Sequence, residues 1–147
     1  MSKLLLIDDN PIEHLIMQRI FTRHQLFTNA DYSPDGRVMI DFLSKNIHNN
    51  TVLPDVIFLD LYMPGFSGFD FLEKFASLYP HFLKPVNIYV VSSSVDKNEQ
   101  RRALSYPFVR EFLTKPVTQN KLFSLYARYS AWSTRKNKKI FLLGIII

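Results

Sequence analysis

The sequence of 147 residues contains no cysteine. The absence of cysteine excludes disulfide bonds, thiol nucleophiles and zinc sites built on thiolates. It also favours a reducing compartment, so we expect a cytoplasmic protein. Long apolar runs are also missing. The N-terminal run ends at Asp8 and is too short for a signal peptide. The run at 140–147 falls well short of the roughly 20 residues that a membrane-spanning helix needs. We therefore expect a soluble chain with no transmembrane segment.

An excess of positive charge is missing from most of the chain. The net charge is +5, but four of the 18 basic residues lie between positions 135 and 139, whereas all 13 acidic residues precede them. The rest of the chain is nearly neutral. A nucleic-acid groove needs basic residues spread along a surface, so we expect no nucleic-acid partner.

The length and the 47% hydrophobic content suit one domain with a substantial core. We expect that domain at 1–130 and a basic, then apolar, tail at 131–147. The tail could pack on the domain, support a homodimer or lie against an anionic membrane surface. Since only this tail follows the last predicted helix, we expect no output domain.

Short apolar runs rich in β-branched residues recur along the chain and alternate with helix-like segments. The runs predict strands at 3–8, 28–32, 56–60, 86–91 and 110–113. Continuous apolar stretches suit strands that are buried on both faces. The sequence therefore predicts an α/β fold, a doubly wound five-stranded parallel sheet with helices on both faces.

Two of the intervening helices carry recognisable features. The first opens with Asn10 and Pro11, a favourable cap and first helical residue, and the spacing of its apolar residues predicts one inward face. That face consists of Ile12, Leu15, Ile16 and Ile20. The fourth helix, at 96–105, opens with an Asp-x-x-Glu cap and is otherwise polar, which indicates weak packing.

Polar side chains follow the predicted strands where ligands bind in such folds, beyond the carboxyl ends. They are Asp8 and Asp9, Asp60, the serines 92–94, and Lys115. Clustered carboxylates repel one another unless a hard divalent cation joins them, and oxygen ligands suit Mg²⁺, for which Mn²⁺ can substitute. Asp60 can then act as a nucleophile toward a phosphoryl group, with the ammonium and a hydroxyl stabilising the charge.

These motifs, together with the run from Asp60 to Gly68 and the Lys115-Pro116 pair, resemble the receiver domains of two-component response regulators, specifically the single-domain, chemotaxis-regulator-like members. The resemblance extends from about position 3 to 129. It implies a flavodoxin-like fold, with Asp60 as the phosphoacceptor. It also implies a metal site formed by Asp8, Asp9, Asp60 and the backbone carbonyl of Tyr62.

The resemblance assigns further roles along strands four and five. Lys115 would pair with the phosphoryl group, and Pro116 would match the family's cis-proline. Ser92 would be the switch hydroxyl, with Ser93 as the alternative, and Phe112 would be the aromatic that turns inward. Ser94 and Tyr62 match positions that border the phosphoryl group and tune its hydrolysis.

The implied function is a signalling switch rather than an enzyme. A histidine kinase or histidine phosphotransfer protein would donate to Asp60, and the altered surface would bind a downstream protein target. Two alternatives stay open: a receiver-like interaction module that is not phosphorylated, and an aspartyl-nucleophile phosphatase. The phosphatase family typically has Asp-x-Asp, whereas this sequence has Tyr62 at the second position.

Overall fold

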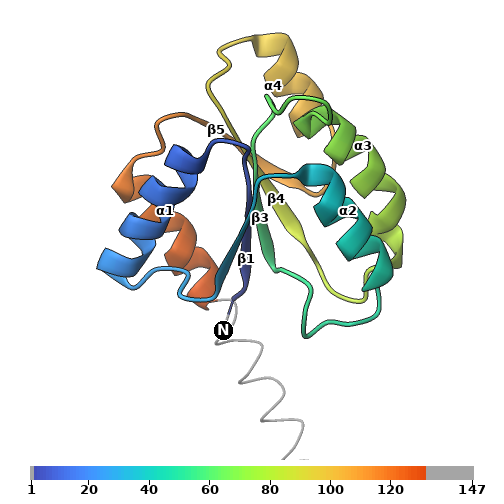
Figure 1. The fold of residues 1–147 in the computed structure, drawn as a ribbon, viewed down its shortest axis with the longest axis horizontal. Helices are drawn as coiled ribbons and strands as arrows, with labels where there is room; N and C mark the ends of the chain where they lie inside the picture. Colours follow the sequence, from blue (N-terminus) through green and yellow to red (C-terminus); the bar gives the residue numbers. More distant parts are fainter. Residues whose placement is uncertain (1, 132–147) are drawn as a thin grey trace, which may run out of the picture.

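The computed structural model describes residues 2–131. Its centre is a parallel five-stranded sheet with the strand order β2-β1-β3-β4-β5 (Figure 1). The strands are β1 (Leu4–Ile7), β2 (Ala30–Ser33), β3 (Val56–Leu59), β4 (Asn87–Ser92) and β5 (Val109–Thr114). Every predicted strand is present, and its ends differ from the prediction by no more than two residues.

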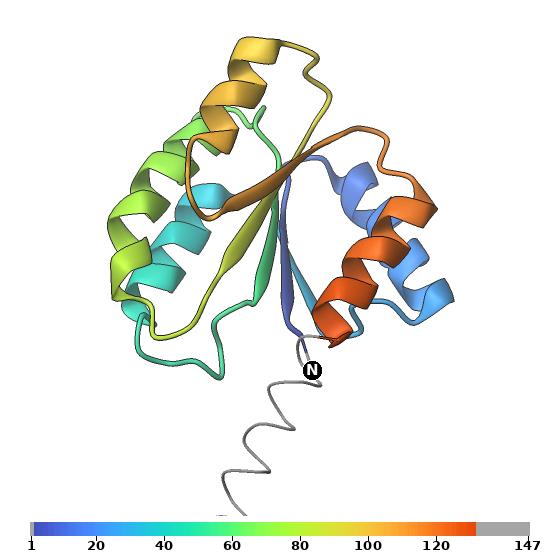
Figure 2. The same ribbon diagram turned by 180° about the vertical axis from the view of Figure 1, so that it is seen from behind.

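Helices cover both faces of this sheet. Helix α1 and the final helix, residues 119–131, lie on one side, and α2 and α3 lie on the other, with α4 above them (Figures 1 and 2). The labelled helices are α1 (Pro11–His24), α2 (Gly36–Lys45), α3 (Gly68–Leu78), the short 3₁₀ helix η1 (Tyr79–His81) and α4 (Lys97–Leu104). The predicted doubly wound α/β architecture is confirmed.

The core has two parts because successive side chains of a strand point to opposite faces. Leu5 and Ile7 of β1 contribute to the cluster under α2 and α3, whereas Leu4 and Leu6 contribute to the cluster under α1 and the final helix. Both clusters include fully buried aromatic rings, Phe75 in the first and Phe58 in the second. The sheet is therefore held rigidly between two apolar layers, and its strand ends have fixed positions.

The inward face predicted for α1 is wrong for three of its four residues, since only Ile20 packs against the core. Its buried residues are Met17 and Phe21, while Ile12, Leu15 and Ile16 are exposed. Phe21 packs edge-on against Phe27 at 5.3 Å between ring centroids, an arrangement that aromatic pairs favour. Helix α1 consequently presents an apolar surface to solvent beside the carboxyl end of the sheet.

Within residues 2–131, none of the helices combines the length and the hydrophobicity that crossing a lipid bilayer demands. The tail predicted at 131–147 lies outside the described residues, except for its first residue, which still belongs to the final helix.

Candidate functional site

The carboxyl ends of β1 and β3 bring three carboxylates together. Asp8 and Asp9 follow β1, and Asp60 follows β3. Backbone bonds extend the sheet by one residue at both places, since the N–H of Asp8 donates to the Ser33 carbonyl and that of Asp60 to the Ile7 carbonyl. Carboxylate oxygens of the three aspartates lie within 4.8 Å of one another. The predicted cluster is thus present.

Lys115 reaches this cluster from the turn after β5. Its ammonium lies 2.7 Å from one carboxylate oxygen of Asp8 and 3.6 Å from one of Asp60. The backbone N–H of Lys115 donates to the Ser92 carbonyl, and the Lys115-Pro116 peptide bond is cis. The predicted carboxylates and the predicted ammonium therefore form one partly buried ionic site.

Burial dominates the electrostatics of Asp60. Desolvation, opposed by the Lys115 charge and reinforced by Asp8, raises the pKa of the Asp60 carboxyl from 3.8 to about 6. Burial alone would lower the pKa of Lys115, but its hydrogen bond to Asp8 and the charge of Asp60 outweigh that effect and raise the pKa. The site therefore carries more negative charge than its lysine neutralises.

The serine run after β4 divides its side chains between the interior and solvent. Ser92 is fully buried and Ser93 is exposed, while Ser94 is buried again. The Ser92 hydroxyl oxygen accepts the backbone N–H of Ser94 at 3.1 Å. Of the two candidates for the switch hydroxyl, only Ser92 points into the domain.

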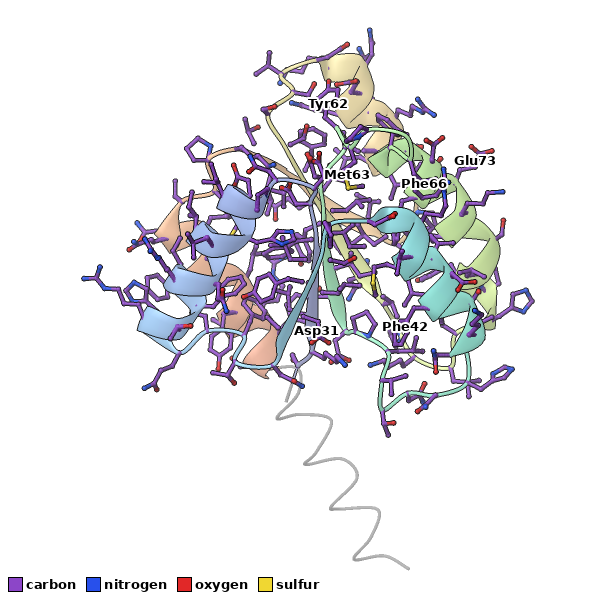
Figure 3. The ribbon with its side chains drawn as sticks, viewed as in Figure 1. Asp31, Phe42, Tyr62, Met63, Phe66 and Glu73 are labelled. Atoms are coloured by element: carbon purple, nitrogen blue, oxygen red, sulfur yellow. The ribbon has the colours of Figure 1, made fainter. Side chains whose placement is uncertain are left out.

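Tyr62 and Phe112 occupy different settings. Phe112 is half-buried against the core cluster under α2 and α3. Tyr62 is exposed at the carboxyl end of the sheet, toward α4 (Figure 3), and its hydroxyl donates to Glu99 at 2.6 Å. This hydrogen bond raises the pKa of the Tyr62 hydroxyl, so the hydroxyl stays protonated as a donor.

Two residues support the site through contacts that the sequence did not predict. Gly68 starts α3, and its backbone N–H donates to the Leu61 carbonyl at 2.9 Å. A Cβ at Gly68 would collide with the backbone of Asp60 and Leu61. Glu99 was expected to complete the cap of α4, but its carboxylate binds Tyr62 and Ser94 instead. The signal for Gly68 was its place at the end of the run from Asp60, whereas the spacing of Glu99 indicated a helix cap and not these contacts.

The donor set fits a hard divalent cation. Three carboxylates converge without any thiolate or imidazole among the ligand atoms that the described residues place there. Mg²⁺ prefers oxygen ligands of this kind and retains several waters. The excess negative charge noted above is the electrostatic reason why such an ion would bind.

The family model of the response regulator receiver domain matches residues 4–127. The chain belongs to this family. The match covers every element from β1 to most of the final helix, so the predicted resemblance is confirmed. Members of the receiver family act in two-component signalling and bind Mg²⁺ through an acidic pocket, which in this receiver domain corresponds to the aspartate cluster.

Curated relatives support the assignment. A protein-glutamate methylesterase/protein-glutamine glutaminase of Enterobacter cloacae is 36% identical over 120 residues, which cover 79% of this chain and 31% of that protein. The protein of the same name from Escherichia coli strain K12 is 34% identical over 120 residues, which cover 79% of this chain and 31% of that protein. The chain thus spans about a third of the length of these relatives.

Solved structures share the fold. A response regulator receiver protein from Dyadobacter fermentans has 25% identity and a TM-score of 0.73, covering 88% of this chain and 98% of that one. The CheX-CheY-BeF3-Mg complex from Borrelia burgdorferi has 20% identity and a TM-score of 0.67, covering 84% of each chain. The flavodoxin-like receiver fold is therefore confirmed.

Proposed function

We propose that this receiver domain is a phosphorylation-controlled switch in which Asp60 accepts a phosphoryl group. The observation that carries the proposal is the contact of Lys115 with both Asp8 and Asp60 inside the carboxylate cluster. A buried carboxylate with an ammonium 3.6 Å away is placed as a nucleophile beside a charge that can receive a phosphoryl oxygen. The donor would be a histidine kinase or a histidine phosphotransfer protein.

Each residue of the site would have its own role in the phosphoryl transfer. Mg²⁺, or Mn²⁺ in its place, would be held by Asp8, Asp9, Asp60 and the Tyr62 carbonyl, and it would supply positive charge to the transferred phosphoryl group. An Asp60 oxygen forms the new bond to phosphorus while the phosphorus–nitrogen bond of the donor breaks. Lys115 leaves Asp60 as a charge partner and pairs with a phosphoryl oxygen.

The output would pass from the site to β5 and α4. Ser92, buried at the end of β4, would donate its hydroxyl to the phosphoryl group, and Phe112 would pack further inward. Ser93, exposed, is the weaker candidate for the switch. The altered face would bind a downstream protein. The Borrelia neighbour was solved as a complex of CheX with CheY, which supports protein binding as the output.

The donor would approach along α1. The exposed apolar residues of α1, Ile12, Leu15 and Ile16, begin beside Asp8 and Asp9, and apolar side chains gathered on a helix favour protein contact.

We propose a receiver domain at 1–130 and a tail at 131–147, and we propose the formation of a homodimer as one role of the tail. A cytoplasmic location and the lack of an enzymatic activity toward other molecules complete the proposal.

Acetyl phosphate tests the central claim. The whole chain is incubated with it, with and without Mg²⁺, and intact mass is followed for the wild type and Asp60→Asn. A Mg²⁺-dependent gain of one phosphoryl group that the variant lacks is expected. A wild type that gains nothing, from acetyl phosphate or from a phosphorylated histidine kinase, would leave the receiver-like interaction module as the better description. Gain of the group by Asp60→Asn would refute Asp60 as the acceptor.

A further inference from the structure

A hydrogen-bonded cluster of three side chains joins separate segments at the carboxyl end of the sheet. Glu99, in the first turn of α4, accepts on one carboxylate oxygen from the hydroxyls of Tyr62, which follows β3, and of Ser94, which follows β4. The Tyr62 bond is 2.6 Å long. A single carboxylate oxygen thus connects two loops to a helix that is otherwise polar and short.

Two of these three residues, Tyr62 and Ser94, also contact the proposed phosphorylation site through their backbone N–H groups. The backbone N–H of Tyr62 stabilises the Asp60 carboxylate. The backbone N–H of Ser94 donates to the Ser92 hydroxyl. Because Tyr62 and Ser94 lie two residues beyond Asp60 and Ser92, the bonds to Glu99 connect the segment that follows β3 with the segment that follows β4.

The position of Glu99 is not explained by a cap of its own helix. In a capping box, its carboxylate would accept the backbone N–H of Asp96. That N–H donates instead to the Ser94 hydroxyl at 3.2 Å, and the Asp96 side chain caps α4 by accepting from Asn98. The carboxylate of Glu99 is therefore committed to the two loop hydroxyls rather than to its own helix.

The Tyr62 ring is held by this contact rather than by packing. The residue is 54% exposed, so burial does little to fix its side chain, and a charged hydrogen bond is the strongest restraint on it. Tyr62 follows β3, and its hydroxyl contacts Glu99 of α4 beside Ser94. The ring must therefore cross the side of the site between β3 and β4. Figure 3 shows Tyr62 at the carboxyl end of the sheet, close to α4.

We propose that Glu99 is a positioning residue that holds the Tyr62 ring across the β3–β4 side of the site, where it restricts the access of water to the Asp60 phosphate. This inference rests on the proposed phosphorylation of Asp60. In hydrolysis, the water oxygen bonds to phosphorus while the bond from phosphorus to the Asp60 oxygen breaks. The carboxylate is regenerated, and the inorganic phosphate keeps both protons of the water. A tethered ring slows this step and prolongs the phosphorylated state.

The test measures the lifetime of the phosphorylated protein in a cycle of variants. The full chain is phosphorylated with acetyl phosphate and Mg²⁺, the donor is removed, and the loss of the phosphoryl group is followed by intact mass. The variants are Tyr62→Phe, Glu99→Ala and the double variant, with Glu99→Gln as the conservative replacement. Glu73→Ala is the matched control, because Glu73 is an exposed acid on the outer side of α3 (Figure 3).

We expect Tyr62→Phe and Glu99→Ala each to speed dephosphorylation about threefold to tenfold, which corresponds to the loss of one hydrogen bond. The double variant should be no faster than either single variant, since all three break the same contact. Glu99→Gln retains an acceptor oxygen and should restore most of the lifetime. Glu73→Ala should match the wild type.

Several results would overturn the inference. Wild-type lifetimes in Tyr62→Phe and Glu99→Ala would show that the tether does not limit hydrolysis, and multiplied effects in the double variant would show that the two residues act separately. A general loss of structure would also weaken Mg²⁺ binding, so unchanged Mg²⁺ affinity in Glu99→Ala is part of the expected result. A wild type that never takes up phosphate would defeat the proposed function itself, whereas normal uptake with unaltered lifetimes would defeat the role of Glu99 alone.

Discussion

Replacing Asp60 by asparagine should stabilise the metal-free protein at neutral pH. Asparagine has nearly the same shape as aspartate but carries no charge. It therefore removes the repulsion from Asp8 and Asp9 and the cost of burying a carboxylate at this position. The variant keeps the ion pair between Lys115 and Asp8, which holds the rest of the site together.

The magnitude follows from the pKa of Asp60. A rise from 3.8 to about 6 means that the folded protein disfavours the charged carboxyl by about 3 kcal/mol, at 1.36 kcal/mol for each unit. Asp60 is almost completely buried, so solvent screening does not remove this penalty. For a domain of this size, 3 kcal/mol corresponds to a rise in Tm of roughly 10 °C.

The sign of the pH dependence is fixed by which state binds the proton. Between about pH 4 and 6 the folded protein keeps the Asp60 proton that the unfolded chain has lost, so the stability of the wild type falls as pH rises through this window. Below pH 4 both states are protonated, and the penalty is absent. Asp60→Asn removes this component, so its advantage should grow from near zero at pH 4 to its full value above pH 6.

Thermal unfolding in EDTA at pH 4 and pH 7 provides the assay. Asp41→Asn is the control, because Asp41 is exposed on α2 and its ion pair with Lys45 contributes only a few tenths of a kcal/mol. Saturating Mg²⁺ should narrow the gap between the wild type and Asp60→Asn, since the ion neutralises the carboxylates. An Asp60→Asn variant that is no more stable than the wild type at pH 7 in EDTA would refute the electrostatic reasoning.

Three further outcomes are expected. Lys115→Met should tighten Mg²⁺ binding about tenfold in calorimetric titration because a competing charge is removed, while slowing phosphorylation by acetyl phosphate at least as much. Gly68→Ala should lower the stability by about 2–4 kcal/mol in denaturant unfolding, since a Cβ there meets backbone, whereas Gly65→Ala should lower it by about 1 kcal/mol through its positive φ alone. Leu15→Ser with Ile16→Ser should leave the Tm and acetyl phosphate reactivity nearly unchanged but slow transfer from a phosphorylated partner.

The five-stranded parallel sheet and the convergence of the site were predictable because both depend on pattern and topology. Five apolar runs separated by helix-length segments leave few arrangements for a parallel sheet, and parallel strands end at one edge. Asp8, Asp9, Asp60 and Lys115 each follow a strand, so their meeting required no knowledge of side-chain packing. The structure brings all four together.

The orientation of α1 was not predictable in the same way. The helix has two neighbouring apolar stripes, one with Ile12 and Ile16 and one with Met17 and Phe21, and hydrophobicity alone does not choose between them. The choice depends on which stripe fits the space beside Phe27. The contacts of Glu99 were missed for a related reason: its spacing indicated a helix cap, whereas one of the hydroxyls that it binds belongs to Tyr62, 37 residues earlier in the sequence.

The charges of the site explain why the proposed transfer would need a divalent ion. Lys115 offsets one of the three carboxylates, while desolvation, reinforced by the charges of Asp8 and Asp9, raises the pKa of Asp60 to about 6. At neutral pH the ionised nucleophile lies beside acids that Lys115 does not offset, and an incoming phosphoryl group would add further negative charge to the same place. One divalent cation would correct both defects, since it would favour the ionised Asp60 and attract the phosphoryl oxygens. Lys115 is already in contact with Asp60, so it needs little movement to join that interaction. The proposed metal requirement therefore follows from the charge imbalance that the fold creates when it places three acids at one edge of the sheet.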